Sequence, residues 1–273
     1  EGMHIKRSTM NDLFHRGACI LEPLYARLLE QIAKRYLVQA DETRLRMLDD
    51  GAGKPKNGFI WTFVAPDDKG GLDVAYRFAA DRSGQTPREI LGGTSGVLLV
   101  AGFSGYNSIA EVSSRVRAAC HAHLRRYFHE SLPTSPVAQE ALDLILELYR
   151  VEHDVQQRGV VGTNSHLEFR QRRSAPARDR LKAWLDDNLG RQMPKSPIGV
   201  AIRYGLNQWD ELGRFLDDAR IPLDNNASER SLRRVALGRK NYLFVGDADS
   251  GANIAGLYSL AATCEARSIN PLE

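Results

Sequence analysis

Two acidic residues stand where a carboxylate could do chemistry, and Asp41 is the first. It lies in the stretch YLVQADET, which alternates like a β-strand, on the side shared with Gln39 and Thr43. A carboxylate inside a buried sheet costs free energy unless it is paired or holds a metal ion. Two interpretations stay open: a structural acid bonded to backbone or a nearby arginine, and a ligand for a hard divalent cation such as magnesium.

The second acid, Glu229, lies in the segment IPLDNNASERSLRRVALGRKNYLF, residues 221–244. Asn226 precedes it by three residues, which is the spacing of a capping box, so Glu229 is either a helix cap or a site residue. Cations crowd the same segment, as in proteins that contact phosphate and also on ordinary solvated faces. They are Arg230, Arg233, Arg234, Arg239 and Lys240.

The third candidate position, Ala101, carries no acidic side chain. The stretch GVLLVAGFSGYN, residues 96–107, carries an apolar run into Ala101 and then a glycine-rich aromatic turn. The run predicts a strand buried on both faces. If its end lies beside the middle of the Asp41 strand, a carboxylate at position 101 would face Asp41, and such a pair holds divalent cations. Otherwise, Ala101 is a small residue that lets the Gly102 turn pack closely.

The elements that must position these residues follow from the spacing of apolar side chains. Strands are predicted at 35–48, 58–67, 72–81 and 96–102, with a short helix at 86–93 before the last of them. Turn residues between the second and third strands favour an antiparallel meander. The predicted order is β-β-β-α-β.

Helices account for most of the remaining chain. The first is predicted from Ser8 or Thr9 to Ile32, bent or interrupted at Pro23. Others are predicted at 109–128, from 135 onwards, at 179–189 and at 198–216, with Trp184 and Trp209 in their core. The polar segment 156–174 is expected to form a loop followed by a basic helix start. A sheet followed by a long helical stretch predicts a mixed α/β core with a helical insertion.

Bulk properties narrow the class of protein. The 273 residues suit one or two domains, and a net charge of +3 permits a polyanion partner without requiring one. Three distant cysteines suggest no disulfide framework, and the sequence shows neither a membrane-length apolar run nor a signal peptide. We therefore expect no membrane partner and a location in the cytoplasm.

Four stretches together resemble a known family. YLVQADET, DRSGQTPREIL, GFSGYN and DNNASERSLRRVALGRKNYLF occur in an order similar to that of insertion-sequence transposases of the sixty-six family. Those are DDE enzymes, and the resemblance covers nearly the whole chain. It implies an RNase H-like mixed sheet with a large helical insertion and flanking helices. We expect a helical lead-in at 1–35, core at 36–128, insertion at 129–220, and the remaining core, with the Glu helix, at 221–273.

The resemblance also implies a catalytic site. Its three acidic positions fall at Asp41, Ala101 and Glu229, and Asp41 and Glu229 would be metal ligands. The family mechanism is DNA cleavage and strand transfer with two Mg²⁺ or Mn²⁺ ions. Because Ala101 replaces the second acid, we expect weak metal binding and almost no catalysis in this copy. An engineered change or natural decay would each explain the alanine.

The implied partner is DNA, as transposon ends and target, and we leave open a homo-oligomer on DNA and accessory proteins. Besides the cations around Glu229, the residues expected to contact DNA are Arg125, Arg126, Arg172 and Arg173, the last two in the arginine-rich stretch 168–180. The cluster CHAHLRRYFH, residues 120–129, lacks the second ligand pair of a zinc site. His123 matches a position that is often histidine in the family.

Two other functions fit some of these observations. A catalytically silent DNA-binding or assembly protein that kept the fold would also tolerate Ala101. A structure-specific RNase H-like nuclease is disfavoured by the Asn-Asn-x-x-Glu-Arg block, which resembles the transposase pattern. The chain is expected to be the catalytic part of a longer transposase.

Overall fold

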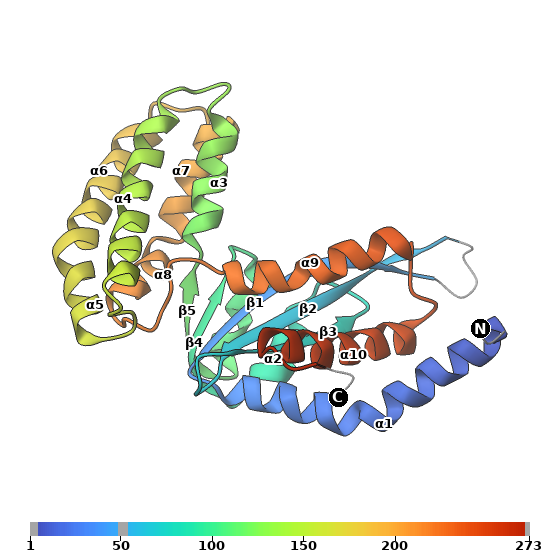
Figure 1. The fold of residues 1–273 in the computed structure, drawn as a ribbon. Coiled ribbons are helices and arrows are strands. Elements are labelled where there is room, and N and C mark those ends of the chain that lie inside the picture. Colours follow the sequence, from blue (N-terminus) through green and yellow to red (C-terminus); the bar gives the residue numbers. More distant parts are fainter. Residues whose placement is uncertain (1–4, 49–53, 271–273) are drawn as a thin grey trace. The chain divides into compact units, whose positions relative to one another are not determined.

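The computed structural model describes residues 5–48 and 54–270 and divides into two compact units (Figure 1). The first unit comprises Glu1–Leu98, Ser104–Val116 and Asn226–Glu273. The second comprises Leu99–Phe103 and Arg117–Asn225. The boundaries predicted above stay predictions, and each unit is described by itself.

A mixed five-stranded sheet, in the order β3-β2-β1-β4-β5, confirms the predicted α/β, RNase H-like class. The first three strands form the predicted antiparallel meander. In its register, Asp41 lies opposite Thr62, and Thr62 lies opposite Tyr76. The strands are β1 (Leu37–Met47), β2 (Lys56–Pro66), β3 (Leu72–Ala79), β4 (Ser95–Val100) and β5 (Ser114–Ala119).

The single helix predicted at 109–128 was wrong before residue 121, where α3 (His121–Ser131) begins. The chain over this range forms the end of a 3-10 helix η1 (Ser104–Glu111), then β5, then α3. The buried side chain responsible is Arg115, which is only 5% exposed. Its guanidinium donates to the backbone carbonyls of Ala33 at 2.6 Å and Val97 at 3.1 Å, so those buried acceptors fix the segment as a strand.

Three long helices complete the first unit. The helix α1 (Arg7–Lys34) runs through Pro23 without a break and bends along its length, as one of the two alternatives had it (Figure 1). Two others, α9 (Asn226–Asn241) and α10 (Ala248–Ala266), flank the meander, and the short α2 (Gln85–Leu91) precedes β4. None of the described helices is long and apolar enough to cross a membrane.

The edge of the sheet at β3 is protected by hydroxyl groups of α10. Ser259 Oγ accepts from the backbone N–H of Tyr76 at 2.8 Å, and Thr263 Oγ1 accepts from that of Val74 at 2.9 Å. Thr263 also donates to the Val74 carbonyl at 2.9 Å. An open strand edge invites pairing with other chains, and these bonds remove that edge.

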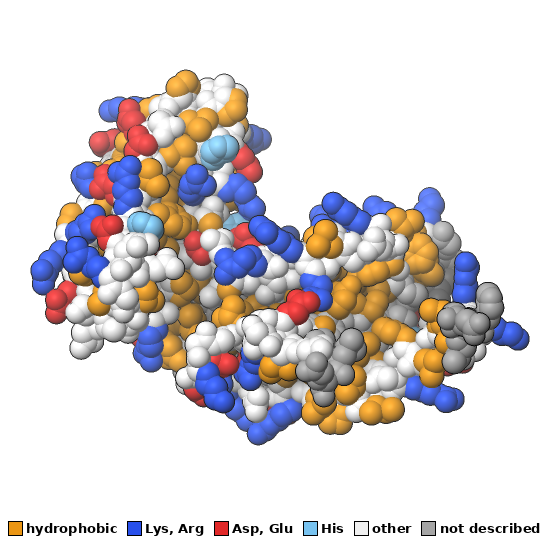
Figure 2. Space-filling view, viewed as in Figure 1, with side chains coloured by type: hydrophobic (Ala, Val, Ile, Leu, Met, Phe, Trp, Pro, Cys, Tyr) orange, Lys and Arg blue, Asp and Glu red, His pale blue; other side chains and the backbone are white. Residues whose placement is uncertain are grey.

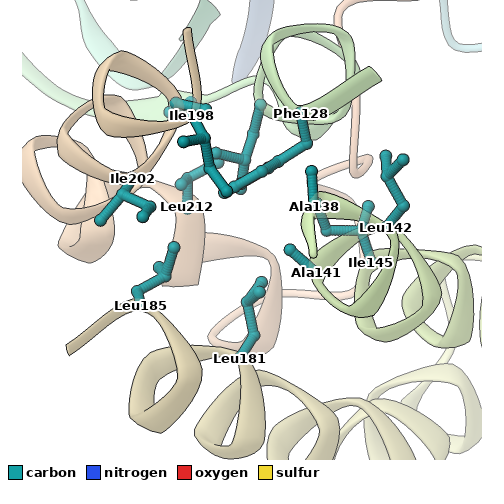
Figure 3. Close-up of a cluster of buried hydrophobic side chains, with 13 residues drawn as sticks. Phe128, Ala138, Ala141, Leu142, Ile145, Leu181, Leu185, Ile198, Ile202 and Leu212 are labelled. Atoms are coloured by element: carbon teal, nitrogen blue, oxygen red, sulfur yellow. The ribbon is translucent and has the colours of Figure 1, made fainter. Parts of the chain in front are cut away.

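Helices make up the second unit and enclose a core of their own (Figure 3). Phe128, Ile145, Leu185 and Ile202 are fully buried there, and both predicted core tryptophans pack against the cluster. Besides α3, the elements are α4 (Ala138–Gln157), α5 (Asn164–Phe169), a π-helical turn η2 (Arg170–Ser174), α6 (Ala175–Leu189), α7 (Pro197–Asn207), α8 (Trp209–Gly213) and η3 (Arg214–Leu216).

The segment predicted as a loop followed by a basic helix start, 156–174, has its loop at 158–163 and is helical from Asn164, in α5 and η2. What the sequence did not show is an internal charge network in this basic stretch. The network surrounds Arg170, which is 1% exposed. Arg170 binds Glu152 through Nε at 2.7 Å and Nη2 at 2.8 Å, and His166 Nε2 lies 3.2 Å from Glu152 Oε2. Charged side chains that pair with each other can enter a core, so the polarity of this stretch did not reveal that Arg170 is buried.

Candidate active site

Asp41 points to the face of the sheet that α9 covers. Alternate residues of a strand share a face, so Asp41 lies on the side of Thr43 and Leu45. Leu45 belongs to the same buried cluster as Leu232 of α9, and Arg239 Nη1 of α9 donates to Thr43 Oγ1 at 3.1 Å. The predicted orientation of Asp41 is therefore correct, and the layer it faces is the β1–α9 interface.

Glu229 lies in the first turn of α9 and is half-buried. It precedes the buried residue Leu232 by three positions, and residues at this spacing share one side of a helix. Leu232 and Val235 are the side chains by which α9 packs against the sheet. The first unit thus carries Asp41 and Glu229 on elements that face each other. The capping-box interpretation of Glu229 stays a prediction.

Two buried oxygen atoms near Asp41 have no hydrogen-bond partner within the described part of the chain. They are Gln39 Oε1, two residues earlier on the same face, and Thr62 Oγ1, directly opposite Asp41 on β2. Gln39 is 7% exposed and Thr62 is fully buried. Burying such oxygens without a partner is costly. Carboxylate, amide and hydroxyl oxygens together are the donor set of a hard divalent cation, so these residues fit one.

The neighbouring acid, Glu42, is held on the opposite face of β1 by side chains that sequence reasoning did not single out. Tyr106 donates its hydroxyl to Glu42 Oε2 at 2.8 Å, and Arg82 Nε donates to Oε1 at 2.8 Å. Burial, followed by the charges of Glu42 and Asp41, raises the pKa of Tyr106 well above its ordinary value. Tyr106 therefore stays a protonated donor and anchors the strand that carries Asp41.

The family-like stretches DRSGQTPREIL and GFSGYN meet at this anchor. Arg82 comes from the first and Tyr106 from the second, and the two segments pack closely at Gly84. A Cβ atom at Gly84 would lie 2.3 Å from the backbone oxygen of Gly105, so no larger residue fits there. Arg88 Nη1 adds a bond to the Ser108 carbonyl at 3.2 Å. No local pattern in the sequence identifies this network, because Glu42, Arg82 and Tyr106 come from three separate segments of the chain.

Ala101 follows β4 and belongs to the second unit. Its backbone oxygen lies 3.5 Å from Arg117 Nη2. The next residue, Gly102, has no room for a side chain, because an added Cβ would lie 2.5 Å from the Tyr204 ring. Tight packing therefore explains Gly102, and the side chain of Ala101 beside it is half-buried.

The predicted DNA-contacting residues of α9 lie in the first unit, and basic side chains gather over this helix (Figure 2). Arg230, Arg233 and Lys240 are exposed. Arg234 pairs with Glu265 of α10, and Arg239 also donates to the Arg44 carbonyl at 3.0 Å. Two of the five are thus partly engaged within the protein.

The other predicted DNA-contacting residues lie in the second unit. Arg125 and Arg126 are exposed on α3. Arg172 is exposed and pairs with Glu168 at 3.1 Å, while Arg173 pairs with Asp154. Surface pairs of this kind are weak and leave an arginine available to phosphate. Arg170 in the same stretch is buried and has a structural role.

The histidines of the 120–129 cluster are packed into α3 in different ways. His121 is 2% exposed, and its Nδ1 lies 3.1 Å from the Leu223 carbonyl. Burial lowers the pKa of His121 to about 4, and burial together with the charge of Arg126 lowers that of His123 to about 4. Both are therefore neutral at physiological pH, and His121 serves packing.

Comparison with known proteins gives consistent matches. The model of the transposase IS66 family matches residues 1–253. Two proteins of Sinorhizobium fredii strain NGR234, the uncharacterized proteins y4qI and y4jD, are 35% and 36% identical to this chain over 100% and 99% of its length. The matches cover 52% and 55% of those proteins, so the chain spans about half the length of the curated relatives it matches.

Proposed function

This chain belongs to the IS66 family of transposases, and on that premise we propose that it is the catalytic domain of a DNA transposase whose second acidic position is vacant. The substrate is DNA, and the reactions are strand cleavage and strand transfer. The observation that carries the proposal is the β1–α9 layer, where Asp41 and Glu229 lie on facing elements beside two orphaned oxygen atoms.

Asp41, Glu229 and a carboxylate at position 101 would hold the divalent cations, Mg²⁺ or Mn²⁺, which when bound activate the attacking hydroxyl group and stabilise the leaving oxygen. Asp41 is fixed by the ladder bonds of β1 and by the Glu42 anchor behind it. Glu229 is fixed by the packing of Leu232 and Val235. Rigid strand and helix positions suit a catalytic site, because misplacement by about 1 Å can cost about 10²-fold in rate.

The cations of α9 would orient the DNA strand at this site. Arg230 and Arg233 lie one and four residues after Glu229 and are exposed. Guanidinium groups bind phosphate oxygens through two parallel hydrogen bonds, which fixes the register of the backbone without reading its sequence. Substituting either arginine would weaken binding to DNA of every sequence.

Ala101 accounts for the proposed inactivity. A methyl group supplies no oxygen ligand, and a site with one bridging carboxylate fewer holds divalent cations less tightly. The Glu42 anchor and the close fit at Gly102 are intact, so the scaffold around the acids is preserved. Restoring one carboxylate is then expected to restore the reaction.

The test is DNA nicking and joining by Ala101→Asp. A supercoiled plasmid that carries the element's own ends would be incubated with the variant and Mg²⁺ or Mn²⁺. We expect nicked and joined products from Ala101→Asp and none from the parent chain. Ala101→Asn, which matches the aspartate in size but lacks its charge, is the control and is expected to stay inactive.

Two further controls separate this site from a contaminating nuclease. Adding Asp41→Asn or Glu229→Gln to Ala101→Asp should abolish both products, because each removes a proposed ligand. Activity that survives either substitution would overturn the assignment. Cleavage without joining would favour the nuclease interpretation instead.

A second function, a silent DNA-binding or assembly protein, is favoured by Ala101 itself. It predicts that Ala101→Asp binds the element's ends as tightly as the parent chain and produces no nicked or joined DNA with either metal. If the natural gene from which this chain derives encodes aspartate at position 101, the engineered enzyme is favoured. If the natural gene encodes alanine there, the silent protein is favoured.

A further inference from the structure

A second polar site lies in the first unit, at the C-terminal end of β1. It is a cavity of about 510 Å³, within the usual range for ligand pockets. Its lining combines four cations with three apolar side chains and one amide. The lining residues are Arg44, Arg46, Pro55, Asn57, Arg239, Lys240, Leu243 and Phe244.

The chain builds this pocket by returning to β1 after α9. The backbone N–H of Val245 donates to the Arg46 carbonyl at 2.8 Å, and that of Leu48 donates to the Val245 carbonyl at 3.0 Å. This short parallel bridge pairs Val245 with Met47. Leu243 and Phe244, which directly precede it, are thereby held beside the β1 arginines on ordered backbone.

Four positive charges converge on the pocket. Arg44, Arg46 and Lys240 are exposed, and Arg239 uses Nη1 to bind Thr43 Oγ1 and the Arg44 carbonyl. No ion pair joins any of the four to an acid among residues 5–48 and 54–270. Clustered like charges repel, and they attract an anion such as phosphate.

Two exposed apolar side chains stand among these cations. Leu243 is 75% exposed and Phe244 is 40% exposed. An aromatic ring beside guanidinium groups offers a base a surface to stack on while the cations bind its phosphate. In an intact duplex the base faces are already stacked on one another, so a ring here gains a partner only from an unpaired nucleotide.

We propose that this pocket binds an unpaired nucleotide of a DNA strand, with its phosphate on the arginines and its base on Phe244. The inference rests on the proposed function, since it takes DNA as the partner. Arg46 lies five residues beyond Asp41, or about 17 Å along one rigid strand. That distance places the nucleotide a few steps along the DNA from the proposed reaction site.

The experiment measures fluorescence anisotropy of a labelled single-stranded oligonucleotide and of the same strand in a blunt duplex. EDTA is present throughout, so binding is read without any metal-dependent reaction. The parent chain should bind the single strand more tightly than the duplex. Phe244→Ala should weaken single-strand binding about 10-fold, because it removes the ring on which the base stacks, and should leave duplex binding unchanged.

Matched variants make the result decisive. Leu237→Ala removes another exposed apolar residue, 63% exposed on α9 and outside the pocket, and should change neither affinity. Phe244→Trp keeps an aromatic ring and should bind the strand at least as tightly as the parent. Arg46→Gln should weaken the strand and lower the salt dependence of its binding by about one ion.

Several outcomes would overturn the inference. Equal loss of strand and duplex affinity in Phe244→Ala would indicate a backbone site only, and an unchanged strand affinity would exclude stacking. If Phe244→Ala fails to fold, Phe244→Trp replaces it as the test, and weaker binding of the single strand by Phe244→Trp would exclude stacking. If polyglutamate displaces the labelled strand as effectively as the unlabelled strand does, the pocket is a surface for acidic proteins. None of these binding outcomes bears on whether Ala101→Asp nicks and joins DNA, so the two proposals can fail separately.

Discussion

His121 should make the helical unit sensitive to acid. Its ring is 2% exposed, with Nδ1 at 3.1 Å from the Leu223 carbonyl and the Phe215 ring centred 5.2 Å away. Burial is the main cause of its pKa of about 4, opposed by the bond to Leu223 and assisted by the charge of Arg178. In the folded protein the ring therefore stays neutral where the unfolded chain, with a pKa of 6.5, already takes up a proton.

The sign and size follow from this difference in proton uptake. Because the folded pKa lies below the unfolded one, the contribution of His121 is complete above about pH 6.5 and is lost as the pH falls towards 4. The full shift corresponds to about 3 kcal/mol, of which about 2 kcal/mol is lost at pH 5. His121→Asn cannot titrate, and its shorter amide can still donate to the Leu223 carbonyl.

The assay is urea unfolding at pH 7 and pH 5, followed by tryptophan fluorescence, to which Trp184 and Trp209, packed against the core of this unit, contribute. Parent and variant share every other titrating group, so the difference between their losses isolates His121. The parent should lose about 2 kcal/mol more than His121→Asn between the two pH values. Equal losses would refute the reasoning. His129→Asn, an exposed histidine of the same helix, is the control and should behave as the parent.

Two other predictions concern stability. Tyr106→Phe removes a buried donor to Glu42 and should lower the free energy of unfolding of the first unit by about 1.5–3 kcal/mol in urea titrations, while a change below about 0.5 kcal/mol would contradict the anchor. Arg170→Met leaves the Glu152 carboxylate without its main partner and should cost about 3–5 kcal/mol, whereas Arg172→Met should cost less than about 1 kcal/mol; similar costs for both would be incompatible with their different burial.

The meander and its acid were predictable because local signals agreed. Alternation of polar and apolar residues fixed the faces of β1, and turn residues separated the following strands, so the orientation of Asp41 came from sequence alone. The short helix α2 followed from its proline in the first turn.

The pattern of polar and apolar residues gave wrong expectations where charged side chains are buried. Arg115 and Arg170 look like solvated surface residues in a sequence, yet each satisfies partners brought from distant parts of the chain. The strand β5 and the buried position of Arg170 were missed for that reason. Likewise, the Tyr106–Glu42 bond joins residues 64 positions apart, and no local pattern predicts which tyrosine is an anchor. Only the fold brings such pairs together.

The most direct test of the central claim is a calorimetric titration of Mn²⁺ into Ala101→Asp, into the parent chain and into Ala101→Asp with Asp41→Asn. If Asp41, position 101 and Glu229 share one metal site, Ala101→Asp binds Mn²⁺ more tightly than the parent chain, and adding Asp41→Asn removes the gain. Equal affinity in all three proteins would contradict the account.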